Sequence, residues 1–170
     1  MSLRSRAESM AQISRTQEIM LTDQLMELTS FSYGKMKELT TSGNEILVDV
    51  EVFCTMGKKY VLRLYISPNF PKSYPSMVVI APGGILRRKD HSLLRFASRQ
   101  DHVLSSRDGY TRISHYPENN WVGNKTLLQV IKKGLVWLEA YEIHLRKGGS
   151  IDRFLQGVAT VLHAELTLCL

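Results

Sequence analysis

The chain has 170 residues, of which 44% are hydrophobic and 22% are charged, values that are typical of a folded globular protein. No run approaches the roughly 18 consecutive apolar residues that a membrane-spanning helix needs, and the N-terminal segment lacks the apolar stretch of a signal peptide. The formal net charge is +6. The basic residues are scattered, however, so the charge favours a solvated surface over a nucleic-acid interface. The one local cluster consists of Arg87, Arg88, Lys89, Arg95 and Arg99.

Cysteine and histidine usage argues against a disulfide framework and against a metal centre. Cys54 and Cys169 are the two cysteines, and they lie far apart in different kinds of segment. A reducing, cytoplasmic compartment is therefore the simpler interpretation. The histidines show no pairing with cysteine or carboxylate at the spacing of zinc ligands. We expect no metal and no cofactor. The histidines are His91, His102, His115, His144 and His163.

The first half of the chain predicts one helix followed by strands. Residues 1–14 read as a disordered lead and residues 15–165 as a single domain. From Thr16 to about Ser30, leucines recur at helical spacing. A weak strand from Tyr33 to Leu39 is expected to precede a hairpin, because two alternating runs flank a short turn. These runs are Ile46 to Cys54 and Tyr60 to Ser67. On this pattern Cys54 is a small buried hydrophobe and not a nucleophile.

A proline-rich turn then leads to a further apolar strand, Met77 to Ala81. Residues 83–109 show no clear period and are expected to form a long irregular loop, with a short helix at His91 to Ser98. Such long gaps are often functional.

The segment Tyr110 to Tyr116 and a Pro/Asn/Gly turn carrying Trp121 precede a long amphipathic helix, Asn124 to Lys147, with Asn124 as its N-cap. A last helix follows Gly148-Gly149. The order predicts an α+β fold: an N-terminal helix, an antiparallel meander of about four strands, a long irregular loop and two C-terminal helices. A large aromatic in a polar turn between strand and helix also suggests a site, the alternative being that Trp121 plugs the end of the core.

Three segments, in this order, resemble the ubiquitin-conjugating enzyme family, and in particular its divergent prokaryotic members. The first is a strand that runs into a tyrosine-proline turn, Tyr65 to Pro75. The second, His102 to Tyr116, is similar to the family's segment from the active-site histidine to the nucleophile. The third is Trp121 with the helix that follows it. The resemblance covers roughly residues 15 to 156 and implies a ubiquitin-conjugating (UBC-like) fold.

The resemblance also implies a pathway and a site. The partners would be a ubiquitin-like protein and its activating enzyme. The site would contain Ser114 at the nucleophile position, with His102, Asn119, Asn120 and Trp121 around it. Asn119 or Asn120 would take the place of the family's oxyanion donor, because the expected position of that asparagine holds Leu104. The partner-binding residues would be Tyr74, Tyr116, Arg87 and Arg88.

The chain departs from the family at the nucleophile, because Ser114 stands where the family has cysteine. A thiol with a pKa near 8.5 is a few per cent thiolate at neutral pH, whereas a serine needs an activating base. His115 is a poor candidate for that base, since neighbours on a strand point to opposite faces. Three interpretations stay open. The chain is a non-catalytic variant that serves as an interaction module, or Ser114 is a substitution that traps an intermediate, or Ser114 is an ordinary strand-end serine bonded to backbone.

Overall fold

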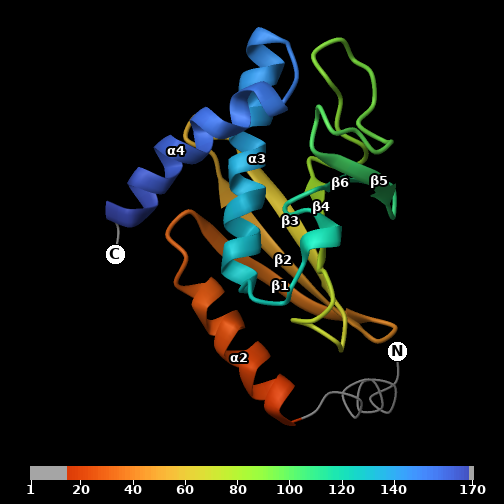
Figure 1. Ribbon diagram of the computed structural model, residues 1–170, viewed down its shortest axis with the longest axis vertical. Coiled ribbons are helices and arrows are strands. Elements are labelled where there is room, and N and C mark those ends of the chain that lie inside the picture. The colour runs from red at the N-terminus through yellow and green to blue at the C-terminus, as the bar shows by residue number, and fades with distance from the viewer. Residues whose placement is uncertain (1–14, 169–170) are drawn as a thin grey trace.

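The computed structural model describes residues 15–168, and within them the side chains of residues 17–161. The predicted lead, residues 1–14, lies outside the described residues. Figure 1 shows an N-terminal helix, a sheet and two C-terminal helices. The helices are α2 (Arg15–Thr29), α3 (Leu127–Lys147) and α4 (Asp152–Leu168), with a 3-10 turn η1 (Glu118–Asn120). The strands are β1 (Gly34–Ser42), β2 (Glu45–Phe53), β3 (Lys59–Ile66), β4 (Ser76–Ala81), β5 (Val103–Arg107) and β6 (Tyr110–Ile113).

The fold is α+β, with one antiparallel sheet of six strands in the order β1-β2-β3-β4-β6-β5. The predicted hairpin is confirmed, because Val50 pairs with Leu62 and Phe53 with Lys59 around the turn. The prediction of about four strands was wrong. Strands β5 and β6 form a second hairpin that adds to β4, and their ladders are too short to show a period of two in the sequence.

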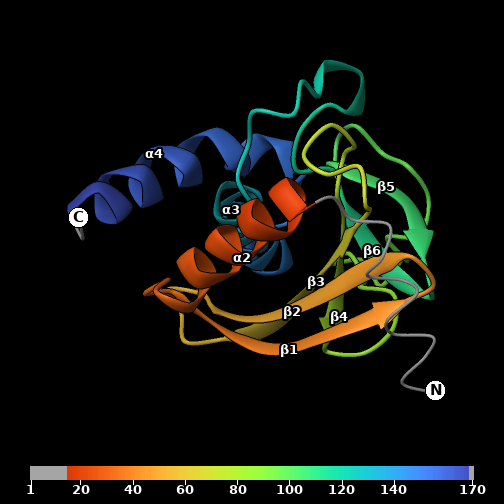
Figure 2. The same cartoon turned by 90° about the horizontal axis from the view of Figure 1, so that it is seen from below.

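All three helices lie on one face of the curved sheet, as the view in Figure 2 shows. Helix α3 fills the centre of the core because its apolar face meets the inward side chains of β2, β3 and β4. Gly134 lets the helix approach closely: a Cβ there would lie 2.6 Å from Leu62 Cδ1 and 2.8 Å from Met77 Sδ. On the outer face of the sheet, Leu47, Tyr65 and Val78 make a small second cluster.

Residues 83–109 are more ordered than the sequence suggested. The predicted short helix at 91–98 does not form. Arg87 instead makes an isolated bridge with Leu93, Ser98 makes one with Val103, and β5 begins at Val103. Leu94 is fully buried, so the apolar residues of this segment pin it to the core without helical periodicity.

Helix α3 begins at Leu127, later than predicted, and Thr126 is its N-cap in place of Asn124. The Thr126 hydroxyl accepts from the Gln129 amide (3.2 Å), and the Gln129 Oε1 accepts from the Thr126 amide (2.9 Å). This reciprocal cap satisfies two donors of the first turn, which a cap at Asn124 would leave open. Gly148 ends the helix at φ 76°, as predicted. Among the described residues, no helix is both long and apolar enough to cross a bilayer.

Candidate functional site

Ser114 follows directly after β6 and opens onto two adjoining clefts. It is half-buried, and it lines one cleft of about 460 Å³ and a second of about 710 Å³. Both clefts are also lined by His102, Pro117 and Asp152. The smaller cleft lies between the end of β6 and helices α3 and α4, and its helical wall consists of Lys133, Val136, Trp137, Leu155, Gln156 and Ala159. The Ser114 hydroxyl makes no hydrogen bond to another of the described side chains or to their backbone.

His102 lies beside Ser114 because a backbone hydrogen bond joins the two residues just beyond the last pair of the β5–β6 ladder. Val103 pairs with Ile113, and one step further the Ser114 amide donates to the His102 carbonyl oxygen at 2.9 Å. The backbone of His102 has φ 50°, in the left-handed region that non-glycine residues seldom adopt. Its ring Nε2 lies 2.6 Å from Oδ1 of Asp152, the first residue of α4.

The backbone on the N-terminal side of His102 is fixed by helices α3 and α4. The indole Nε1 of Trp137 donates to the carbonyl oxygen of Asp101 at 2.8 Å. The amide of Asp152 donates to the carbonyl oxygen of Gln100 at 2.9 Å. The Asp101 carboxylate is held in turn by Arg88, at 2.7 Å. These contacts tie the backbone before His102 to helices α3 and α4.

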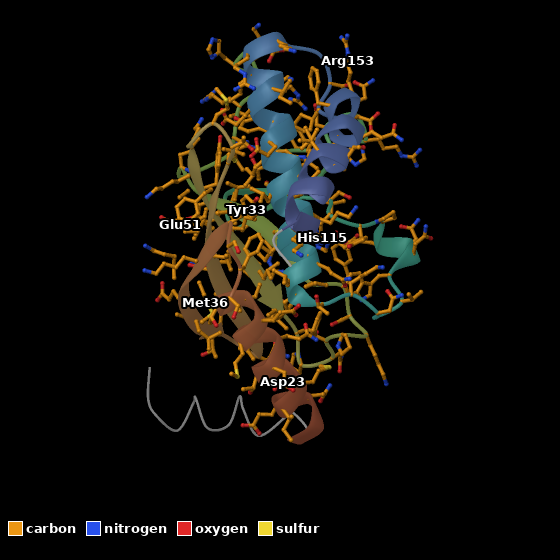
Figure 3. All side chains as sticks on the ribbon, turned by 90° about the vertical axis from the view of Figure 1, so that its left-hand side faces the viewer. Asp23, Tyr33, Met36, Glu51, His115 and Arg153 are labelled. Atoms are coloured by element: carbon orange, nitrogen blue, oxygen red, sulfur yellow. The ribbon has the colours of Figure 1, made fainter. Side chains whose placement is uncertain are left out.

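His115 is buried, and its contacts do not suit a base for Ser114. Its Nε2 donates to the carbonyl oxygen of Pro75 at 2.7 Å, and its ring stacks on Tyr74 with centroids 4.3 Å apart. Burial lowers the pKa of His115 to about 4, so the ring is neutral near pH 7. Its Nδ1 is buried without a partner among the described residues. Figure 3 shows His115 beside α3, whose residues share a cleft with it.

Trp121 anchors the turn after Ser114 and does not line either cleft. Its Nε1 donates to the carbonyl oxygen of Pro71 at 2.8 Å, and its ring packs edge-on against Tyr74, Tyr116 and His115. Two lysines lie over the Tyr116 ring, Lys133 at 5.3 Å and Lys125 at 5.7 Å. Because Tyr116 and Lys133 both line the smaller cleft, this wall carries positive charge.

The structure therefore brings some of the predicted site residues together and leaves others apart. His102, Ser114, Tyr116 and Asn119 line the clefts, and Asn120 is exposed on η1 without lining them. Tyr74 stacks behind His115.

The predicted partner-binding arginines lie elsewhere. The Arg87 guanidinium donates to the carbonyl oxygen of His91, and the backbone carbonyl of Arg87 accepts a hydrogen bond from the Tyr141 hydroxyl. The Arg88 guanidinium donates to the Asp101 carboxylate. Arg88 lines a separate cleft at the C-terminal end of α3.

Sequence reasoning missed Asp152 and Lys133. Asp152 is 50 positions from His102 along the chain, and no spacing rule links them. Only the packing of α4 against α3 brings the carboxylate to the cleft.

Cys54, the one cysteine whose side chain the structure describes, offers no alternative nucleophile. Cys54 is 4% exposed, and burial raises the pKa of its thiol to about 12, with Glu139 and Glu142 adding to the shift. No group of three or more histidine, cysteine or carboxylate side chains within residues 17–161 is arranged to hold a metal ion.

Neither a family model, nor a curated protein, nor a solved structure matches this chain. The site is therefore interpreted on its own geometry. That geometry is a serine hydroxyl at a cleft with no hydrogen bond to the described residues, a histidine whose carbonyl oxygen accepts the serine amide, and a carboxylate bonded to that histidine.

Proposed function

We propose that this chain is a UBC-like domain that acts in a ubiquitin-like protein conjugation pathway in the cytoplasm, with Ser114 at the acyl-accepting position. The observation that carries the proposal is the place of Ser114, half-buried at the end of β6 and open to two clefts. A serine enclosed in the sheet would have argued against it.

The arrangement of the elements also supports the proposal. A helix precedes the antiparallel meander, the site segment follows the sheet, and α3 lies behind the site with α4 after it. The turn from Ser114 to Trp121 is braced against the tyrosine-proline turn by the bond from Trp121 to Pro71. Helices on both faces of a parallel sheet would have been incompatible with a UBC-like domain.

A charging assay tests the proposal. The protein and a Ser114→Cys variant are incubated with a panel of ubiquitin-like proteins, each with its activating enzyme and ATP. All versions carry Cys169→Ser, so that the introduced thiol is the only one besides buried Cys54. We expect a reducible adduct on Ser114→Cys, and a slower, reductant-resistant oxyester or no adduct on the original chain, because serine needs an activating base.

Ser105→Cys is the matched control. Ser105 is an exposed serine on β5 that lines neither cleft. Equal adducts on Ser105→Cys and Ser114→Cys would mean that any exposed thiol is charged, which contradicts the proposal. The absence of an adduct on Ser114→Cys would favour a non-catalytic interaction module on the same fold.

A further inference from the structure

The geometry points to a serine acyl-transfer site in which His102 takes the proton of the Ser114 hydroxyl and Asp152 holds the His102 ring. We propose that the chain itself reacts with activated acyl esters or thioesters at Ser114. This inference rests on the proposed function only in that Ser114 is the acyl acceptor. It adds His102 as the base that a serine in that position needs.

The end of the β5–β6 ladder brings the two reacting residues to the same clefts. The last pair of that ladder is Val103 with Ile113, and beyond it the Ser114 amide donates to the His102 carbonyl oxygen at 2.9 Å. His102 and Ser114 both line the two clefts. The hydrogen bond between their side chains need not be closed in the unliganded protein, since catalytic contacts often tighten only when substrate binds.

The bond between His102 and Asp152 decides which nitrogen can act. With Nε2 bonded to the Asp152 carboxylate at 2.6 Å, the neutral ring carries its proton on Nε2. Nδ1 then keeps a free lone pair, and it makes no hydrogen bond to the described residues. An exposed pair of this kind adds little to the stability of a fold, so orienting the ring is the better reason for it.

The clamps around His102 make the arrangement preorganised. Trp137 and Asp152 fix the carbonyl groups of Asp101 and Gln100, and His102 is held in a left-handed backbone conformation. Such conformations persist where the surroundings determine them and cluster at functional sites.

The chemical step balances without a further reagent besides the acyl donor. The Ser114 Oγ forms a bond to the acyl carbon while His102 Nδ1 accepts the hydroxyl proton. The bond from the acyl carbon to the leaving alcohol or thiol breaks, and that group takes the proton from His102. Water or an amine then attacks the acyl-serine while His102 Nδ1 accepts its proton. The bond from the acyl carbon to the Ser114 Oγ breaks, and the Oγ takes that proton from His102.

The smaller cleft suggests the acyl group. Its volume of about 460 Å³ falls in the range of small-molecule sites, and Val136, Leu155 and Ala159 supply an apolar wall. Lys133 is the one lysine in its lining. A short apolar acyl chain fits this lining, with Lys133 near the polar end.

The test uses the full chain alone, with p-nitrophenyl acetate and a fluorophosphonate as probes. We expect a burst of p-nitrophenol and a single labelled residue, Ser114, in peptide mass spectrometry. Ser114→Ala should abolish both. His102→Asn should lower the acylation rate about a hundredfold or more, because this is the usual contribution of a general base. Asparagine also tolerates the left-handed backbone, so the fold should be kept.

Asp152 acts through His102, so it is a positioning residue. Asp152→Asn should lower the rate about tenfold or more, and Asp152→Glu should recover part of it. Added imidazole should restore part of the rate of His102→Asn after subtraction of its own reaction with the ester. His91→Asn is the matched control, because His91 is an exposed histidine with φ 71° outside the clefts, and it should acylate like the parent.

Two results would overturn the inference. One is labelling of the Ser114→Ala variant at the parent rate. The other is a His102→Asn variant that acylates normally, or that loses activity without rescue by imidazole, which would make His102 merely structural. The charging assay is independent of both. An adduct on Ser114→Cys, together with a parent that reacts with neither the ester nor the fluorophosphonate, would remove the serine chemistry and keep the proposed function. A parent that reacts with these probes, together with no adduct on Ser114→Cys, would remove the proposed function and keep the serine chemistry.

Discussion

The indole of Trp137, 2% exposed in the core, donates its Nε1–H to the main-chain oxygen of Asp101 at 2.8 Å. The same ring stacks on Tyr141, with centroids 5.3 Å apart. Through this bond helix α3 holds the residue immediately before His102. This hydrogen bond thus connects the core to the candidate site.

Trp137→Phe should weaken the fold and loosen the site together. Phenylalanine keeps much of the apolar volume but leaves the buried Asp101 carbonyl without its donor, which costs about 1–3 kcal/mol. Urea unfolding measures the loss, and hydrogen exchange of the residue 98–104 amides should accelerate. Phe96→Leu is the control, because Phe96 is 74% exposed and contributes little. An equal effect of the two substitutions would contradict the role of the indole.

Two helical glycines should respond to alanine with opposite signs. At Gly134 a Cβ would lie 2.6 Å from Leu62 Cδ1, so Gly134→Ala should lower the free energy of unfolding by about 1–3 kcal/mol. At Gly157 on α4 nothing lies within 4 Å of the added Cβ, so Gly157→Ala should raise it by about 0.5–1 kcal/mol through helix propensity. Thermal and urea unfolding compare them. Stabilisation by Gly134→Ala would disprove the close packing of α3.

The buried imidazole of His115 should make stability depend on pH. Its pKa falls from 6.5 to about 4 on folding, because burial disfavours the charged form. Between these values the unfolded chain binds more protons, so stability rises with pH through this window. The contribution is complete above about 6.5 and is lost as the pH falls to about 4. Its size is roughly 3 kcal/mol at most.

His115→Gln isolates this contribution, since glutamine keeps a donor for the Pro75 carbonyl but does not titrate. Urea unfolding at several pH values measures the free energy of unfolding. Between pH about 6.5 and about 4 it should change less with pH in the variant than in the parent. Parallel curves would show that His115 titrates normally in the folded protein.

The hydroxyl of Tyr60 should contribute more than a typical buried tyrosine. It donates to the Glu142 carboxylate, which is 9% exposed and is otherwise paired with Lys58 at 3.0 Å. Tyr60→Phe removes a hydrogen bond to a charged group and should cost about 1.5–3 kcal/mol in urea unfolding. Tyr110→Phe serves as the comparison, because the Tyr110 hydroxyl has no such partner among the described residues, and it should change stability little.

Some of the site could be anticipated from residue patterns, and some could not. The turn that carries Trp121 is a local feature, whereas Ser114 was selected through the resemblance to the ubiquitin-conjugating family. The structure places Ser114 at a cleft. The contact between His102 and Asp152 joins two segments 50 residues apart, and the direction in which α4 crosses α3 decides it. Likewise Trp121 was expected to frame the site, whereas its indole is directed to Pro71.

The sequence by itself determined the helices with strong periodicity, the β2–β3 hairpin and the α+β class, because alternation and helical spacing are local consequences of burying one face. Only the tertiary structure decided that 83–109 contributes a strand, that Thr126 caps α3, and that a carboxylate from the last helix meets a histidine beside Ser114. These features depend on the register of short ladders and on the packing of distant elements. Neither leaves a periodic trace in the order of the residues.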